Sequence, residues 1–155
     1  MIEGIVTKQL KQYADERGWL IEILRSDWEH FQKFGQAYIT AAYPQVVKAW
    51  HMHKKQTDNI TCITGMIKLV LYDDREKSQT KKEINELIIG EKNLLLIKIP
   101  PGIWHGFKTI TEQCALVLNI PTELYNYDKP DEYRLPPDTD KIPYDWKLTP
   151  WLKNG

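Results

Sequence analysis

The stretch that decides the fold is Lys48-Ala49-Trp50-His51-Met52-His53-Lys54-Lys55-Gln56-Thr57-Asp58, together with Pro100-Pro101-Gly102-Ile103-Trp104-His105-Gly106-Phe107. These two segments hold three of the four histidines of the chain. On an extended strand, residues two apart point to the same face, so His51 and His53 present two imidazoles side by side. If that face lines the interior of a barrel, both become pocket residues, whereas on a surface strand they only meet water. The polar neighbours Lys48 and Asp58 favour the pocket.

Strands are predicted on both sides of these segments. Runs of β-favouring residues cover 36–42, 60–64, 66–72, 84–89, 94–99, 107–110 and 115–120. Gly65 predicts a tight connection between neighbouring strands, and 90–93 predicts a second hairpin. One short helix is expected over 26–35, with Ser26-Asp27 as its cap and Gly35 as its end. This spacing of strands and turns is typical of a β-sandwich or barrel.

Length and composition limit the function classes. The chain has 155 residues, which fits one domain, and 42% hydrophobic and 27% charged residues are ordinary for a globular protein. Its 21 basic residues cancel its 21 acidic ones, so no basic field favours nucleic acid or an anionic membrane. No signal-like or membrane-spanning run is recognisable, so we expect a cytoplasmic protein. A disulfide between Cys62 and Cys114 is possible, but reduced thiols are expected in the cytoplasm.

The last part of the chain has a different composition. From residue 121 onward, prolines alternate with tyrosines and tryptophans, including Tyr125, Tyr127 and Trp151. Prolines at this density prevent regular ladders, while the aromatic rings supply apolar area to bury. We therefore expect a single domain with an N-terminal arm and short helix (1–35), a barrel core (36–120) and an ordered wrapping tail (121–155).

The two histidine segments carry a resemblance to a known fold. His51-x-His53, Asp58 and Gly65 resemble the first cupin motif, with Asp in the usual Glu place, and 100–105 resembles the core of the second. The resemblance implies an all-β cupin double-stranded β-helix, or jelly roll.

A narrower resemblance covers most of the chain. The segment 15–22 resembles the D-x-R-G-x-F-x-E opening of the dTDP-4-dehydrorhamnose 3,5-epimerase family, 73–80 resembles its D-x-R-x-x-S-x-T segment, and 105–107 its H-G-F. Gln36 stands at the family's spacing before His51. This implies a nucleotide-sugar isomerase that epimerises a dTDP-4-keto-6-deoxyhexose or similar sugar by removing a proton next to the ketone.

The resemblance also implies roles for individual residues. His51 matches the catalytic base, with His105 and His53 as further imidazoles of the pocket. We expect a neutral His51, favoured by the charge of Lys48. The residues expected to hold the substrate are Arg17, Glu22, Gln36, Lys48 and Gln56. No cofactor is expected, and the family's dimer implies a homodimer that exchanges N-terminal residues.

The chain departs from the family pattern at four positions. The enolate-stabilising lysine falls on Asp58, whose negative charge would repel an enolate. The acid tyrosine falls near Leu118-Asn119, and an interior aspartate falls on Leu69. The aspartate that orients the base has no counterpart near the C-terminus. Substitutes for the missing acid are His53, Tyr125 or Tyr127, and Lys54 or Lys55 could stabilise the enolate.

Three alternatives follow from these departures. His51-Met52-His53-Lys54-Lys55 resembles a segment of the nucleotide-sugar 3,4-ketoisomerases, a neighbouring cupin family. A metal-binding cupin would hold one divalent ion with His51, His53, Asp58 and His105, a donor set suited to Fe, Mn, Ni or Zn. A non-catalytic nucleotide-sugar-binding protein would explain the lost catalytic residues.

Overall fold

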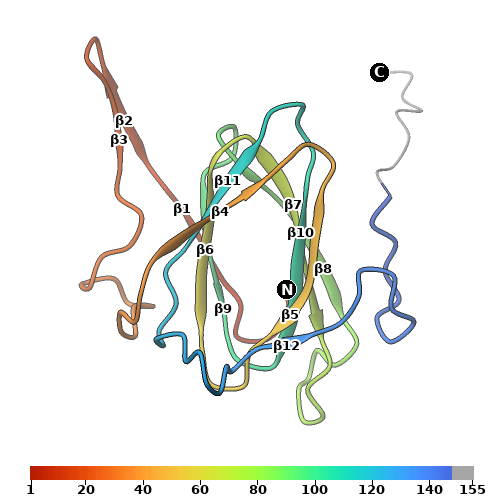
Figure 1. Ribbon diagram of the computed structural model, residues 1–155. Coiled ribbons are helices and arrows are strands. Elements are labelled where there is room, and N and C mark those ends of the chain that lie inside the picture. Colours follow the sequence, from red (N-terminus) through yellow and green to blue (C-terminus); the bar gives the residue numbers. More distant parts are fainter. Residues whose placement is uncertain (148–155) are drawn as a thin grey trace.

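The structure is a computed structural model that describes residues 1–147, and this part of the chain contains twelve β-strands and no α-helix. Two five-stranded antiparallel sheets face each other as a jelly roll (Figure 1). The first sheet has the order β1 (Val6–Gln9), β9 (Leu95–Ile99), β6 (Asp58–Thr64), β11 (Ala115–Asn119), β4 (Tyr38–Ala42). The second has the order β12 (Tyr133–Arg134), β5 (Val47–Met52), β10 (Ile103–Thr109), β7 (Met66–Asp73), β8 (Ile84–Gly90). A separate hairpin of β2 (Gln12–Asp15) and β3 (Gly18–Ile21) extends away from the barrel. The predicted all-β jelly roll is confirmed.

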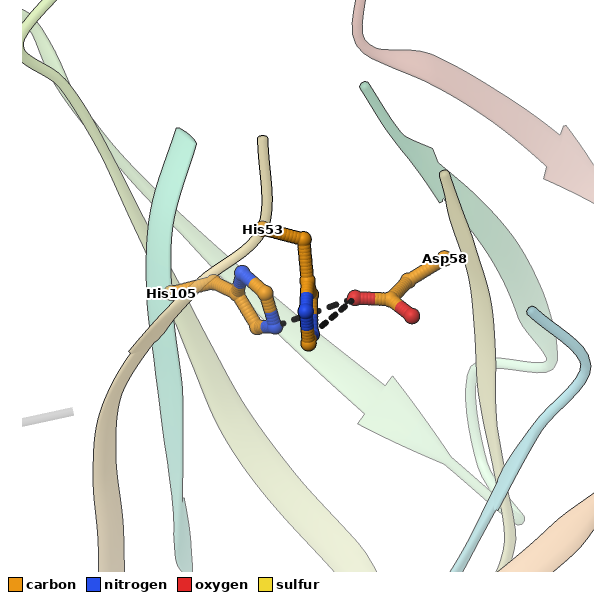
Figure 2. A group of neighbouring side chains, drawn as sticks. All are labelled: His53, Asp58 and His105. Carbon is orange, nitrogen blue, oxygen red and sulfur yellow. Dashed lines mark ion pairs between the residues drawn. The ribbon is translucent and has the colours of Figure 1, made fainter. Parts of the chain in front are cut away.

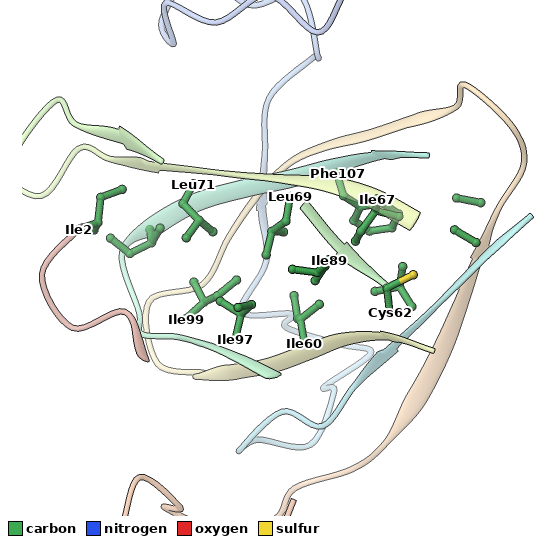
Figure 3. Packing of buried hydrophobic residues seen from close by; sticks show 14 residues of the cluster. Ile2, Ile60, Cys62, Ile67, Leu69, Leu71, Ile89, Ile97, Ile99 and Phe107 are labelled. Atoms are coloured by element: carbon green, nitrogen blue, oxygen red, sulfur yellow. The ribbon is translucent and has the colours of Figure 1, made fainter. Parts of the chain in front are cut away.

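The apolar core lies between the two sheets (Figure 3). Ile97 and Ile99 of β9 and Leu69 and Leu71 of β7 are spaced two residues apart, so both members of each pair point inward. Ile2 is buried in the same cluster, and β1 pairs with β9. The N-terminal residues before the β2–β3 hairpin therefore belong to the first sheet and its core.

No helix in the described part of the chain is long and apolar enough to span a membrane.

The C-terminal segment is ordered as far as the structure describes it, and it covers the outer face of the second sheet. Ile142 and Trp146 pack against Trp50, Val70 and Tyr72 of that sheet. Because this outer face is buried as well, residues 67–73 of β7 are all buried instead of alternating between buried and exposed. The final residues of the predicted tail, including Trp151, lie outside the described residues.

The predicted short helix over 26–35 is wrong. Only two single turns form there, with hydrogen bonds from Trp28 N to Arg25 O and from Phe31 N to Trp28 O. The Asp27 carboxylate accepts from the Arg25 side chain instead of capping a helix. Gly35 N donates to Pro121 O, which draws the segment to the start of the tail. A segment this short gains too little from its own hydrogen bonds to remain helical against such contacts.

The predicted hairpins at Gly65 and at 90–93 are also wrong, although the strands themselves exist. β6 and β7 lie in different sheets, and so do β8 and β9, so each glycine turn is a corner between the sheets. The two corners pack together, since Glu91 N donates to Gly65 O. A Cβ at Gly90 would lie 2.1 Å from Gly65 O, so only glycine fits. Both cysteines, Cys62 and Cys114, are free thiols, as expected.

Candidate active site

A cavity of about 550 Å³ opens between the two sheets. Its floor is apolar, because Ile60, Phe107 and Val117 belong to the core cluster. Its walls carry polar side chains from both sheets and from the tail: Gln36, Tyr38, Thr40, Lys48, His51, His53, Gln56, Asp58, His105, Asn119, Tyr125, Tyr127, Glu132 and Arg134. An apolar floor with a few convergent polar groups is typical of a small-molecule site.

His51 is held by an acidic residue of the tail. β12 pairs with β5, and His51 Nδ1 lies 2.9 Å from Glu132 Oε1. Glu132 Oε2 accepts from Arg134 Nη2 at 2.8 Å. A carboxylate accepts only, so Nδ1 of His51 carries the proton and Nε2 keeps its lone pair. This is the arrangement of an oriented imidazole base.

The pKa of His51 is lowered, mainly by burial and next by the nearby His105, while the contact with Glu132 opposes the shift. The ring therefore remains neutral at physiological pH, as a base requires. The expectation that the charge of Lys48 lowers the pKa of His51 was wrong, because burial and His105 are the main causes. Lys48 Nζ instead donates to Ala41 O at 2.7 Å.

Three other side chains form a buried cluster across the barrel, which we call the His–Asp–His cluster: His53, Asp58 and His105 (Figure 2). The rings of His53 and His105 point toward Asp58, which reaches them from β6 on the facing sheet. Asp58 Oδ2 lies 3.3 Å from His105 Nε2 and 3.5 Å from His53 Nε2. The ring centroid of His105 lies 6.4 Å from that of His51 and 6.0 Å from that of His53.

The hydrogen bonds of the two rings fix where their protons lie. His105 Nδ1 donates to Ile103 O at 3.1 Å, and His53 Nδ1 donates to Asp131 O. Carbonyl oxygens accept only, so each neutral ring turns an Nε2 lone pair toward the carboxylate of Asp58. A proton or a divalent metal ion between these groups would relieve the repulsion between the two lone pairs and the carboxylate.

The environment of Asp58 keeps it ionised. Its Oδ1 accepts from Gln56 Nε2 at 2.7 Å and from Asn119 Nδ2 at 2.8 Å. Burial alone raises the pKa of Asp58, but the contacts with His105 and His53 and the Asn119 amide outweigh burial and hold the pKa well below its ordinary value. The sequence-based view that Asp58 would repel an enolate changes accordingly, because both of its carboxylate oxygens already face the two amides and the two imidazoles.

The residues predicted to hold the substrate divide into two groups. Gln36, Lys48 and Gln56 line the cavity with the histidines. Arg17 and Glu22 do not. Arg17 pairs with Asp15 on the exposed β2–β3 hairpin, where it lines a separate shallow depression, and Glu22 pairs with Arg25.

Several residues of the site were missed in the sequence. Glu132 and Asp131 both lie in the tail and act on the histidines, and Asp131 also accepts from the backbone N–H groups of residues 54–56. Tyr38 and Asn119, which line the cavity and are hydrogen-bonded to each other, were not predicted either. The alternation Glu132-x-Arg134 was the one local signal, since it puts an acid and a base on the same side of an extended segment.

The D-x-R-x-x-S-x-T segment is structural. The buried carboxylate of Asp73 accepts from the guanidinium of Arg75 and from the hydroxyls of Ser78 and Thr80. These bonds outweigh burial and lower the pKa of Asp73 strongly. Arg75 also donates to Glu3 O, so the segment ties the N-terminus to the turn after β7.

The fold and the pocket define a cupin-type jelly-roll protein with an oriented imidazole base in its cavity. A sequence model of the dTDP-4-dehydrorhamnose 3,5-epimerase family matches residues 1–154. The chain belongs to that family.

Individual relatives agree with this membership. The chain is 45% identical to the probable low-salt glycan biosynthesis epimerase Agl13 of Haloferax volcanii over 147 residues, which cover 94% of each protein. It is 40% identical to the spore coat polysaccharide biosynthesis protein SpsL of Bacillus subtilis, covering 94% of this chain and 97% of that one. The crystal structure of a dTDP sugar isomerase from Desulfovibrio desulfuricans G20 superposes with a TM-score of 0.89 at 34% identity, covering 94% of this chain and 92% of that one. The predicted membership in an epimerase family is therefore confirmed.

Proposed function

We propose that the protein inverts a stereocentre next to the ketone of a nucleotide-linked 4-keto-6-deoxyhexose, with a dTDP sugar as the first candidate. The observation that carries this proposal is the His51–Glu132 pair in the wall of the cavity. Membership in the epimerase family and the similarity to a dTDP sugar isomerase support the substrate class.

In this reaction His51 acts as the base. Its Nε2 removes the proton next to the ketone, and Glu132 stabilises the imidazolium that forms. The electron pair of the broken C–H bond moves to the ketone oxygen and gives an enolate. A proton held between Asp58 and one of the two imidazoles would offset the negative charge of Asp58, so that the cluster does not repel the enolate oxygen.

A metal-bound form of the cluster is the second candidate, favoured by its geometry. The ligand atoms of His53, Asp58 and His105 lie within 4.8 Å of one another, whereas His51, the fourth expected ligand, is not part of this group. Two imidazoles with Nδ1 bound to carbonyl oxygens and one carboxylate are a set that holds divalent transition metals. Metal analysis of protein purified without a histidine tag separates the candidates: about one ion per chain supports the metal form, and none supports the protonated cluster.

We further propose that the protein acts as a homodimer. Arg17 and Glu22 match substrate-holding positions, yet they lie on or beside the exposed hairpin of their own chain. The same hairpin exposes apolar side chains, with Trp19 61% and Leu20 59% accessible, and Ile39 on the edge strand β4 is 56% accessible. A second copy would cover these side chains and receive Arg17 at its cavity.

Light scattering tests the dimer. The wild type should have twice the mass of one chain, and Trp19→Lys with Leu20→Lys should be monomeric and lose affinity for dTDP. A wild-type monomer that binds dTDP with full affinity would overturn this proposal.

We place the reaction in the cytoplasm, because the free thiols of Cys62 and Cys114 fit a reducing compartment. The balanced net charge supports a nucleotide-linked sugar, rather than a nucleic acid or a membrane, as the partner.

Proton exchange with solvent tests the function directly. In D₂O, dTDP-4-keto-6-deoxyglucose should gain deuterium next to the ketone and yield an inverted sugar, as followed by NMR. His51→Ala should abolish exchange and leave dTDP binding nearly intact. Movement of the ketone from C4 to C3 would instead establish a 3,4-ketoisomerase, and binding without exchange in the wild type would establish a binding protein.

A further inference from the structure

Inversion needs a second proton source, on the face of the sugar opposite to the base. A histidine that both removes and returns the proton restores the starting configuration. Because His51 belongs to β5 in the second sheet, the opposite face of a bound sugar meets the first sheet. The second proton donor is therefore to be sought among the cavity residues of the first sheet.

We propose that Tyr38 is this donor, an inference that rests on the proposed function. Tyr38 begins β4, which is the edge strand of the first sheet, and its side chain lines the cavity together with His51. The base and the phenol thus come from facing sheets, as inversion requires.

The hydrogen bonds of Tyr38 leave its own proton available. Tyr38 is the cross-strand partner of Asn119 on β11, and Asn119 Nδ2 donates to Tyr38 Oη at 2.9 Å. The second hydrogen of that amide goes to Asp58 Oδ1, which fixes the orientation of the amide. Since the phenol oxygen is an acceptor in this bond, and no other bond to it occurs within residues 1–147, its O–H hydrogen can point to the substrate.

The environment keeps the phenol protonated until it reacts. Tyr38 is 42% accessible, and its partial burial, and next the negative charge of Asp58, raise its pKa to about 12. The group is therefore a donor rather than a base at physiological pH. When it releases its proton, the Asn119 N–H stabilises the phenolate.

The other candidate donors fit less well. Tyr125 and Tyr127 belong to the tail rather than to a sheet, and Tyr127 is 89% accessible. The centroids of their rings lie 5.0 Å apart, so the two rings pack against each other. His53 follows β5, the strand of His51, and both of its ring nitrogens are engaged with Asp131 and Asp58.

The proton balance of the step is simple. His51 Nε2 takes the proton from the carbon next to the ketone, and the C–H electron pair forms the enolate. The enolate pair then forms a new C–H bond with the Tyr38 proton on the opposite face. His51 is left protonated and Tyr38 deprotonated, and one proton returns from imidazolium to phenolate through solvent.

Tyr38→Phe separates the two half-reactions. Deuterium exchange next to the ketone, which needs only His51, should stay within about threefold of the wild type. Inversion should fall at least 100-fold, the usual contribution of a positioned general acid, so the ratio of inversion to exchange collapses. The matched control is Tyr125→Phe with Tyr127→Phe, which removes two hydroxyls from the same cavity and should leave that ratio unchanged.

Each outcome is decisive. If Tyr38→Phe inverts at the wild-type rate, or if it loses exchange together with inversion while remaining folded by circular dichroism, Tyr38 is not the donor. If the tail variant loses inversion instead, the donor lies in the tail. If the wild type shows no exchange at all, the proposed function itself fails, which is a different result from failure of Tyr38 alone.

Discussion

Replacing Glu132 with glutamine tests the link between the tail and the base. Glu132 Oε1 lies 2.9 Å from His51 Nδ1, and the side chain of Glu132 is 15% accessible against 32% for His51. Glutamine can still accept from Nδ1, but it cannot neutralise the imidazolium that forms when His51 removes a proton. The variant should therefore lose turnover while binding remains.

The size of the loss follows from this contact. A hydrogen bond to a charged group contributes about 1.5–3 kcal/mol of stabilisation. Because His51 is partly exposed and solvent screens the contact, we expect a value in the lower half of this range, about 1.5–2 kcal/mol. Since about 1.4 kcal/mol corresponds to a factor of ten, the exchange rate should fall roughly 10–30-fold. The dissociation constant of dTDP should stay within about twofold, because the lost interaction belongs to the transition state.

Deuterium exchange followed by NMR measures the first quantity, and titration calorimetry with dTDP measures the second. Arg134→Met is the control, because Arg134 Nη2 donates to the other carboxylate oxygen of Glu132 and its side chain is 68% accessible. Its effect should stay below about fivefold, as expected for an exposed ion pair. A folded Glu132→Gln protein with the wild-type exchange rate would refute the role given to Glu132.

Three further predictions concern stability and packing. Asp73→Asn should lower the free energy of unfolding by about 2–4 kcal/mol, because it removes the charge that Arg75 faces. Because the pKa of Asp73 is strongly lowered in the folded protein, this contribution is present at neutral pH, begins to shrink as the pH falls below about 4, and is lost only near the much lower folded-state pKa. The difference in melting temperature between variant and wild type should therefore narrow steadily below about pH 4, and a constant difference would contradict the argument. A Cβ at residue 106 would lie 2.3 Å from Ala49 Cβ and would push β10 away from β5. Gly106→Ala should therefore reduce both the deuterium-exchange rate and the melting temperature. An unchanged melting temperature would show that the two strands have room for the added methyl group. Leu71→Ala, at a fully buried position, should cost about 2–5 kcal/mol in urea unfolding, and a cost below about 1 kcal/mol would mean that the core collapses around the gap.

The sequence alone determined the strands of the barrel and most of the cavity. Alternating and continuous apolar runs mark β6 to β9 because strand side chains repeat every two residues. The same rule put His51 and His53 on one face, and both do line the cavity. Family motifs added His105, Gln36, Lys48 and Gln56, which lie in the same cavity.

Local signals failed where distant contacts decide the conformation. The capping residues and the apolar spacing of 26–35 predicted a helix. In the structure, however, Gly35 N donates to Pro121 O, and Trp28 packs against the cluster of Leu10, Leu94 and Leu96. Gly65 and Gly90 marked turns correctly, but a turn residue does not specify whether the next strand pairs with the previous one or crosses to the facing sheet.

The catalytic partners were decided by the tertiary structure alone. The sequence has neither an orienting aspartate nor an acid tyrosine at the family's positions. The folded chain supplies Glu132 to His51 and brings Tyr38 to Asn119, and each pair is separated by 81 residues in sequence. Cross-strand pairing sets such neighbours, and because β11 lies beside β4, a phenol on one strand can occupy the space next to a residue on the other. Whether a side chain lies in the pocket depends on which strands are neighbours in the sheets. No local sequence pattern encodes that strand order.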